Sequence, residues 1–418
     1  MKTQKSLALI ACAVLSLAAA SCDNEKGDTT PAVEPTPIVL PEGTRSFTES
    51  GNDFSFRLFK VVVSTGKDNA VISPLNVMTT LAMLANGDNG ESRDEILRAL
   101  GREAGEPELN SLTAYYKSMH AQLPKVDRTT DVRFANSFWY APGVTLNGAF
   151  TDLLASQFTA DLVNKTVGGT EGMNAVNEWV KNETRGLIER LLDEPLPGAT
   201  KSALLDAVYF KGMWKEKFDK SKTAPAVFHN SDGSESEVPF MYREGEYACA
   251  SLGDMKAVSL PYGNGNFRMT VILPEGNGDI RSLVSAIGSQ TLTDIDSQAK
   301  RLKVKLYLPK FECSTNRDVQ KSLNKLGVNR LFNPGAGLNS VYTQGEDPFF
   351  AGLFRHAATV KVDEEGSEGA ATSLVPEGFI SPEPAYDGGE IRVDRPFLFL
   401  ITETTTGAVL FIGQITEL

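Results

Sequence analysis

Three residues of this chain could together perform nucleophilic catalysis. Ser73, Asp206 and His356 are a serine, an acid and a histidine, the residue types that serine hydrolases combine into a catalytic triad. The sequence contains no Gly-x-Ser-x-Gly motif, the strand-to-helix turn that exposes the nucleophile of α/β-hydrolases. A structural network of these side chains is therefore favoured over a hydrolase site, and the sequence predicts no catalytic residue.

Histidines and cysteines are too sparse to suggest a metal site. His120, His229 and His356 are each more than about a hundred residues from the next, so they offer no local ligand spacing for zinc or haem. No metal and no other cofactor is predicted. Cys249 and Cys313 are expected to be free thiols, because the other two of the four cysteines lie in the N-terminal segment.

The composition is that of an ordinary globular protein with an acidic surface. Of the 418 residues, 41% are apolar and 22% are charged, and 41 Lys plus Arg stand against 53 Asp plus Glu for a formal charge of -12. Phosphate contacts require clustered cations, so nucleic acid is excluded as an expected partner. The body of the protein is expected to be a monomer.

The N-terminus carries an export signal. Lys2 and Lys5 precede an apolar run over residues 7–20, which has the length of a signal-peptide core and is too short for an easy membrane span. Small residues lead from this run into Cys22, and this resembles the lipobox of bacterial lipoproteins, in which the cysteine is lipidated. The alternative is a plain cleavable signal. We expect a signal peptide at residues 1–21 and secretion across the inner membrane.

The segment after the signal is predicted to be a tether. Residues 22–44 contain Pro31, Pro35, Pro37 and Pro41 among acidic and small residues, with too little apolar surface to fold alone. A lipid on Cys22 would anchor the protein at the outer membrane or cell surface, and this anchor would be its only contact with a membrane. The remainder, residues 45–418, is expected to form one domain.

Helical and strand patterns are mixed through this domain. A helix should start at Pro74 after an N-capping serine, and residues 203–210 read as a strand buried on both faces, with Asp206 inside it. Residues 303–308 alternate as a half-exposed strand, and the Gly-Asn-Gly-Asn run at 263–266 predicts a hairpin. The sequence therefore favours an α+β fold with mainly antiparallel strands.

One long segment stands out as functional. Between a strand at residues 359–362 and a strand starting near Ile391 lie almost thirty residues rich in glycine and proline. A loop of that length inside a compact domain is usually functional or disordered. Its first half is built from small residues, which could be loop in one state and strand in another.

The start of this segment resembles the reactive-loop hinge of serpins. The hinge residues are Glu364, Glu365, Gly366, Ser367, Glu368, Gly369, Ala370, Ala371, Thr372 and Ser373. Further blocks resemble the family in its own order, at residues 69–75, 134–139, 209–214, 308–311 and 394–399. The resemblance covers about residues 47–418. It implies the serpin fold, with three mainly antiparallel sheets, about eight or nine helices and an exposed reactive-centre loop at about residues 364–391.

The resemblance also implies an activity that is not enzymatic. In serpins a protease cleaves the loop, and the freed hinge inserts into the central sheet and traps the acylated protease. The family's spacing predicts cleavage between Ile380 and Ser381, with Phe379 as the second candidate for the residue before the cut. These residues suit elastase-like, subtilisin-like or chymotrypsin-like serine proteases, with cysteine proteases as a further class, and disfavour trypsin-like enzymes.

Insertion requires small, uncharged residues at every second position of the hinge. Ser367, Gly369, Ala371, Ser373 and Val375 would face inward, and none of them is charged or large. Near the end of the strand a proline and an inward glutamate oppose insertion. A non-inhibitory serpin that acts as a cleavable or binding surface protein is therefore the alternative to an inhibitor.

Two clusters are implied to control the opening of the sheet. Ser73, Asp206 and His356 correspond to the family's cluster under the middle of the central sheet. Asp206 stands where the family commonly has Asn, which suggests that opening is pH-sensitive. Trp214 and Lys310, with Glu364, correspond to the cluster at the end where insertion begins, and an ion pair between Lys310 and Glu364 is expected there.

Overall fold

The helix predicted to start at Pro74 and the strands predicted at residues 203–210 and 303–308 are present, and the chain between residues 34 and 418 forms one unit. The computed structural model describes residues 34–64, 68–88, 90–276, 278–333, 338, 340–343, 353–367 and 389–418. The α-helices in these ranges are α1 (Arg45–Val63), α2 (Pro74–Ala85), α3 (Glu91–Ala99), α4 (Glu106–Gln122), α5 (Gly148–Phe158), α6 (Gly169–Glu183), α7 (Ile280–Ala286), α8 (Ser289–Gln298) and α9 (Gln320–Lys325). The architecture is α+β, as predicted.

Helix α2 lies at the centre of the fold. Every residue from Pro74 to Ala85 is buried, including the polar Asn76, Thr79 and Thr80, so the helix is enclosed by protein on all sides. Ser73 has an extended backbone and Pro74 takes the first helical position, as the sequence predicts. The Ser73 side chain makes no capping hydrogen bond, however, so the prediction of a capping serine is wrong for its hydroxyl.

The larger sheet contains nine strands in the described part of the chain. Its order is β1-β15-β14-β8-β7-β6-β9-β13, with β5 paired to β6. The strands are β1 (Ala70–Ile72), β5 (Ala224–His229), β6 (Glu235–Leu252), β7 (Met255–Tyr262), β8 (Phe267–Pro274), β9 (Lys300–Pro309), β13 (Glu390–Arg392), β14 (Phe397–Glu403) and β15 (Val409–Ile415). The predicted hairpin at residues 263–266 joins β7 to β8.

The smaller sheet has the order β10-β11-β12-β4-β2-β3. Its strands are β2 (Thr130–Tyr140), β3 (Asp161–Asn164), β4 (Ser202–Met213), β10 (Phe311–Asp318), β11 (Phe354–Val362) and β12 (Gly366–Ser367). Counted by hydrogen bonds, two sheets replace the three expected. The reason is that β6 is 18 residues long and pairs in turn with β5, β9 and β7, which joins two groups of strands into one network.

Strands β4 and β11 form a parallel pair in the middle of the smaller sheet. They pair directly from Leu204 and Phe354 to Val208 and Ala358. At the far end of the same two strands, β12 lies between them and runs antiparallel to both. A strand placed between two parallel strands can run antiparallel to both of them, as β12 does here. The β4–β11 pair is therefore the place where the sheet can accept another strand.

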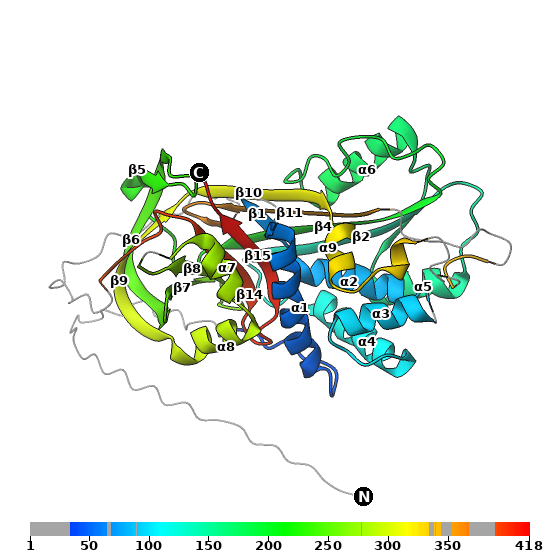
Figure 1. Cartoon of the computed structure of the whole chain (residues 1–418), viewed down its shortest axis with the longest axis horizontal. Coiled ribbons are helices and arrows are strands. Elements are labelled where there is room, and N and C mark those ends of the chain that lie inside the picture. Colours follow the sequence, from blue (N-terminus) through cyan, green and yellow to red (C-terminus); the bar gives the residue numbers. More distant parts are fainter. Residues whose placement is uncertain are drawn as a thin grey trace, which may run out of the picture. The chain divides into compact units, whose positions relative to one another are not determined.

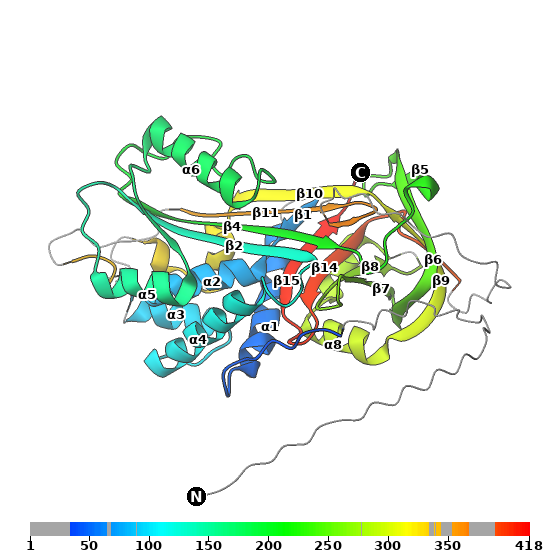
Figure 2. The same ribbon diagram turned by 180° about the vertical axis from the view of Figure 1, so that it is seen from behind.

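Helices cover both faces of the smaller sheet. Helix α6 lies on one face, and α2 with its neighbours lies on the other, as both views show (Figures 1 and 2). On the α6 side, Val176 and Val180 belong to an apolar cluster with Leu205, Ala207 and Ala357 of the sheet. No helix in the described ranges is long and apolar enough to cross a membrane.

The second half of the predicted tether is part of the folded unit. Residues 34–44 are described, and Ile38 is buried in the main apolar core. Backbone groups of Thr36 and Val39 form hydrogen bonds with side chains of the body. Residues 34–44 therefore do not form a free tether, because Ile38 is buried and the backbone of Thr36 and Val39 is hydrogen-bonded to the body. Cys22 and residues 1–33 lie outside the described ranges.

Candidate functional site

The hinge begins with a tight turn. The carboxylate of Asp363 accepts hydrogen bonds from the backbone N–H groups of Glu365, at 2.9 Å, and Gly366, at 3.3 Å. The Asp363 N–H donates to the Gly366 carbonyl at 2.8 Å, which closes the turn. Gly366 has φ +153, and a β-carbon built there would lie 1.9 Å from the Gly212 carbonyl oxygen. Only glycine fits this position.

This turn sends the chain back into the sheet as β12. Ser367 lies opposite Gly212 of β4 and Val362 of β11. Its side chain, predicted to face inward, is 1% exposed, and its Oγ lies 2.7 Å from the hydroxyl of Tyr262. Burial raises the pKa of Tyr262 far above its ordinary value, so the phenol keeps its proton. The first two sheet-forming residues of the hinge thus already occupy the position between β4 and β11.

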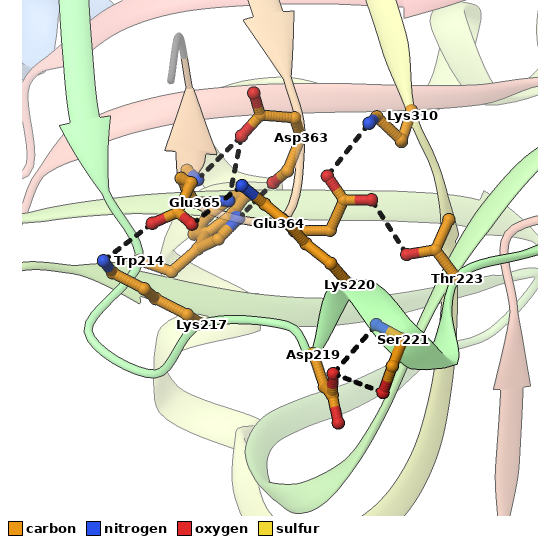
Figure 3. A network of polar contacts seen from close by, with 11 residues as sticks. Trp214, Lys217, Asp219, Lys220, Ser221, Thr223, Lys310, Asp363, Glu364 and Glu365 are labelled. Carbon is orange, nitrogen blue, oxygen red and sulfur yellow. Dashed lines mark hydrogen bonds and ion pairs between the residues drawn. The ribbon is translucent and has the colours of Figure 1, made fainter. Parts of the chain in front are cut away.

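Glu364 is held on the outer side of the turn. Lys310 Nζ lies 2.9 Å from one carboxylate oxygen, and the hydroxyl of Thr223 donates to the other at 2.8 Å (Figure 3). Burial opposes ionisation of Glu364, but hydrogen bonds from Lys310, its own backbone and Thr223 outweigh it and lower its pKa. The expected ion pair is present, and it is more than a surface pair because Glu364 is only 4% exposed.

Glu365 is bound by the segment that follows β4. Lys217 Nζ lies 2.7 Å from one carboxylate oxygen and Lys220 Nζ 3.2 Å from the other (Figure 3). The hydrogen bond from Lys217 is the largest cause of the lowered pKa of Glu365. The sequence did not predict these partners, or Thr223 and Tyr262. The signal that could have found the two lysines is the group of four lysines at residues 215–222, which offers partners for the consecutive acids Glu364 and Glu365.

Trp214 joins the hinge to the end of β4. Its indole N–H donates to the Asp363 carbonyl at 2.9 Å, and its backbone N–H donates to the Glu365 carbonyl at 2.8 Å. Its ring stacks on Tyr262 with centroids 4.4 Å apart. The tryptophan therefore holds both ends of the turn, and any further movement of the hinge into the sheet must change its surroundings.

A second cluster lies under the middle of the sheet, where β4 and β11 pair directly. His356 Nδ1 and Asp206 Oδ1 are 2.7 Å apart, and the Thr80 hydroxyl donates to the other carboxylate oxygen at 3.1 Å. The Ser73 backbone N–H donates to His356 Nε2 at 3.0 Å. Since Nε2 accepts this bond, the ring carries its proton on Nδ1 and donates it to Asp206. The structure brings all three predicted residues together.

This arrangement does not suit hydrolysis. A catalytic serine would bond to the histidine through Oγ, yet here His356 Nε2 is occupied by the backbone of Ser73. Ser73 Oγ has no hydrogen-bond partner in the described part of the chain. Ser73, Asp206 and His356 are each 0% exposed, so no substrate could reach them. The network links α2 and the residue before it to both parallel strands.

Several predicted site residues lie outside the described ranges. They are Cys22, Phe379, Ile380, Ser381, and the hinge residues Glu368, Gly369, Ala370, Ala371, Thr372 and Ser373. In the described ranges, no three His, Cys, Asp or Glu residues are grouped to hold a metal ion. Cys249 and Cys313 are both buried free thiols, and burial raises the pKa of Cys313 to about 12, so it is unreactive.

Comparison with known proteins decides the family. The serpin (serine protease inhibitor) family model matches residues 49–418. The chain belongs to the serpin family. Over 386 residues it is 32% identical to iripin-3 of Ixodes ricinus, covering 91% of this chain and 97% of the relative. The serpin fold expected from the hinge is thereby established.

Two solved structures are similar to this one. Native tengpin, a thermophilic serpin, superimposes with a TM-score of 0.82 at 25% identity, covering 92% of this chain and 98% of tengpin. Human thyroxine-binding globulin, solved as a complex with thyroxine, gives a TM-score of 0.81 at 22% identity, covering 90% of this chain and 99% of that chain. The second likeness concerns the fold alone.

Proposed function

We propose that this serpin inhibits a serine protease by trapping it after cleavage of the reactive loop. The observation that carries the proposal is the position of β12. Gly366 and Ser367 lie between β4 and β11, opposite Met213 and Gly212, and antiparallel to both strands. The sheet therefore already contains the first pairs of an added strand.

Continuing the register of β12 links the two clusters. Ser367 lies opposite Gly212 and Val362, and residue numbers run in opposite directions along antiparallel strands. Six residues further, Ser373 would arrive opposite Asp206 and His356, which lie six residues before Gly212 and Val362. The bond between Asp206 and His356 closes this place at present, so complete insertion would have to break it.

The chemistry of the hinge supports insertion as far as this point. Ser367 and Ser373 have the same parity, so both would face inward, and a small hydroxyl can bond to a buried acid or imidazole. The new strand would run antiparallel to both of its neighbours and replace a short parallel pairing by full ladders. Loop insertion would therefore stabilise the protein, and this gain in free energy can drive the trapping of the protease.

The cleavage site and the target are carried over from the loop sequence. We place the cleaved bond between Ile380 and Ser381, or one residue earlier, after Phe379. These residues favour an elastase-like, subtilisin-like or chymotrypsin-like serine protease as the target. We extend the proposal to a lipid on Cys22 that anchors the inhibitor at the bacterial cell envelope, which rests on the signal at residues 1–21. Mass spectrometry of the N-terminal peptide tests that part.

The alternative is a serpin that does not inhibit. Pro376 and Glu377 would reach the sheet late in insertion, where a proline removes a ladder hydrogen bond and a buried carboxylate needs a partner. Thyroxine-binding globulin, which shares the fold, is described by a bound ligand rather than by a protease. In this alternative the loop would be cleaved without trapping.

A trapping assay separates the two functions. The full chain is incubated with pancreatic elastase, chymotrypsin and subtilisin, and products are analysed on denaturing gels and by mass spectrometry. A denaturant-resistant complex together with a peptide beginning at Ser381 is expected. Complete cleavage of the loop with no complex from any of the three proteases would contradict the inhibitory function and support the alternative.

A further inference from the structure

An N-terminal strap, residues 34–40, is hydrogen-bonded to the turn that joins β7 to β8. The Thr36 N–H donates to Asn266 Oδ1 at 2.7 Å, and Asn266 Nδ2 donates to the Thr36 carbonyl at 2.7 Å. The amide of Asn266 thus pairs with the strap as a neighbouring strand would. Asn266 is 0% exposed, so these bonds are formed at a buried group rather than on a solvated surface.

The strap continues across two more elements. The Ile38 N–H donates to the hydroxyl of Thr405, in the turn between β14 and β15, at 3.1 Å. One residue later, the Val39 N–H donates to Gln122 Oε1 at 2.9 Å, and the Val39 carbonyl accepts from Gln122 Nε2 at 2.9 Å and from the Ser118 hydroxyl at 2.8 Å. The strap therefore ties the end of α4 to two turns of the larger sheet.

The turn that binds the strap directly follows a residue that contacts the hinge. Tyr262, whose hydroxyl contacts Ser367, precedes the turn, and Asn266 ends it. Between them, the Gly263 N–H donates to the Met213 carbonyl at the end of β4 at 2.8 Å, and the Asn264 side chain donates to the carbonyl of Val126, which follows α4, at 2.8 Å. Residues 262–266 therefore connect the strap to Ser367, where insertion would start.

Insertion must move the elements that the strap joins. A strand that enters between β4 and β11 separates β4 from β11, and β2 moves with β4 because the two pair along the whole of β2. Helix α4 ends at Gln122 and the chain enters β2 at Thr130, so α4 is coupled to this movement. The β14–β15 turn belongs to the larger sheet, and a strand that enters between β4 and β11 does not separate any strands of that sheet.

From this geometry we infer that the strap is a brake on loop insertion. Because it bonds to α4 on one side and to the β14–β15 turn on the other, separation of β4 from β11 stretches or breaks those bonds. Docking of the strap then favours the form with the exposed loop, and detaching it favours insertion. The inference rests on the proposed function, since it concerns the lifetime of the inhibitor before a protease is met.

A proline tests the strap without changing the body. In the full chain, Thr36→Pro removes the N–H that donates to Asn266, and Thr36→Ala is the matched control because it keeps that N–H. Thr36 is exposed and lies between two prolines, so neither change is expected to disturb folding. Both proteins are incubated below their melting temperature, and the fraction able to trap protease and the fraction converted to a heat-resistant form are followed with time.

Faster loss of the exposed-loop form is expected in Thr36→Pro. Removal of one hydrogen bond of ~1 kcal/mol should raise the conversion rate about fivefold over Thr36→Ala, with equal trapping by the two proteins at the start. Equal or slower conversion in Thr36→Pro, including no conversion in either protein, would overturn the brake. If neither protein traps a protease at the start, the proposed function fails instead, and the heat-resistance measurement still decides about the strap.

Discussion

His120 is a buried histidine whose protonation at low pH should destabilise the fold. The Thr79 hydroxyl donates to the Leu75 carbonyl at 2.8 Å, so its contact of 2.9 Å with His120 Nε2 places the ring proton on Nε2. Nδ1 has no partner in the described part of the chain, and the ring stacks on Phe134 with centroids 4.4 Å apart. Burial lowers the pKa of His120 from 6.5 to about 4.

This shift predicts a loss of stability in acid. The unfolded chain binds a proton on His120 near pH 6.5, and the native chain does so only near pH 4. The free energy of unfolding should therefore decrease as the pH is lowered from 6.5 to 4, by about 3 kcal/mol in all. Urea unfolding from pH 7 to pH 4 measures it. His120→Leu should show a flatter pH dependence, and an unchanged slope would contradict this role.

The same titration examines the closed cluster under the sheet. His356 accepts the Ser73 N–H through its unprotonated Nε2, and protonation there would replace that bond by a clash of two donors. Asp206→Asn removes the ionisable partner. If its stability varies with pH as the wild type does, the hypothesis of pH-sensitive opening at Asp206 is wrong.

At the scale of elements, the hinge turn decides whether β12 stays in the sheet. Gly366 has a positive φ, and its neighbour in β4 leaves no room for a side chain. Gly366→Ala should therefore push β12 out of the sheet and oppose the same register during insertion. The loop would then be cleaved faster than it inserts.

Gly366→Ala should still be cleaved by the protease, but a smaller share of the cleaved molecules should trap it. More molecules should be consumed as substrate for each protease trapped, by several-fold, as measured by titrating protease activity and by gel quantification of the cleaved form. Gly198→Ala is the control, because no atom lies within 4 Å of a β-carbon built at Gly198. A trapping ratio equal to that of this control would show that β12 does not guide insertion.

At the scale of the whole molecule, cleavage should stabilise the protein. A hinge strand inserted from Ser367 toward Ser373 and beyond would form on the order of ten new ladder hydrogen bonds, at ~1 kcal/mol each. With roughly 2 °C per kcal/mol for a chain of this size, the melting temperature of the cleaved form should rise by about 20 °C. Differential scanning calorimetry before and after loop cleavage measures it. An unchanged midpoint would mean that the cleaved loop stays outside the sheet.

Much of the fold and part of the site followed from local patterns. The hinge residues Glu364 to Ser367, the helix start at Pro74 and the hairpin at residues 263–266 each depend on side chains close together in the chain, which set backbone conformation directly. The ion pair of Lys310 with Glu364 followed from the family pattern.

The tertiary structure alone decided the rest. The pairing of Glu365 with Lys217 and Lys220, the docking of Thr36 on Asn266, and the merging of strands through β6 join residues far apart in the sequence. Such contacts form only when packing brings distant segments together, and no local periodicity encodes which segments will meet. The sequence by itself determined that a loop could become a strand, and the packing decided how far it has already done so and what holds it there.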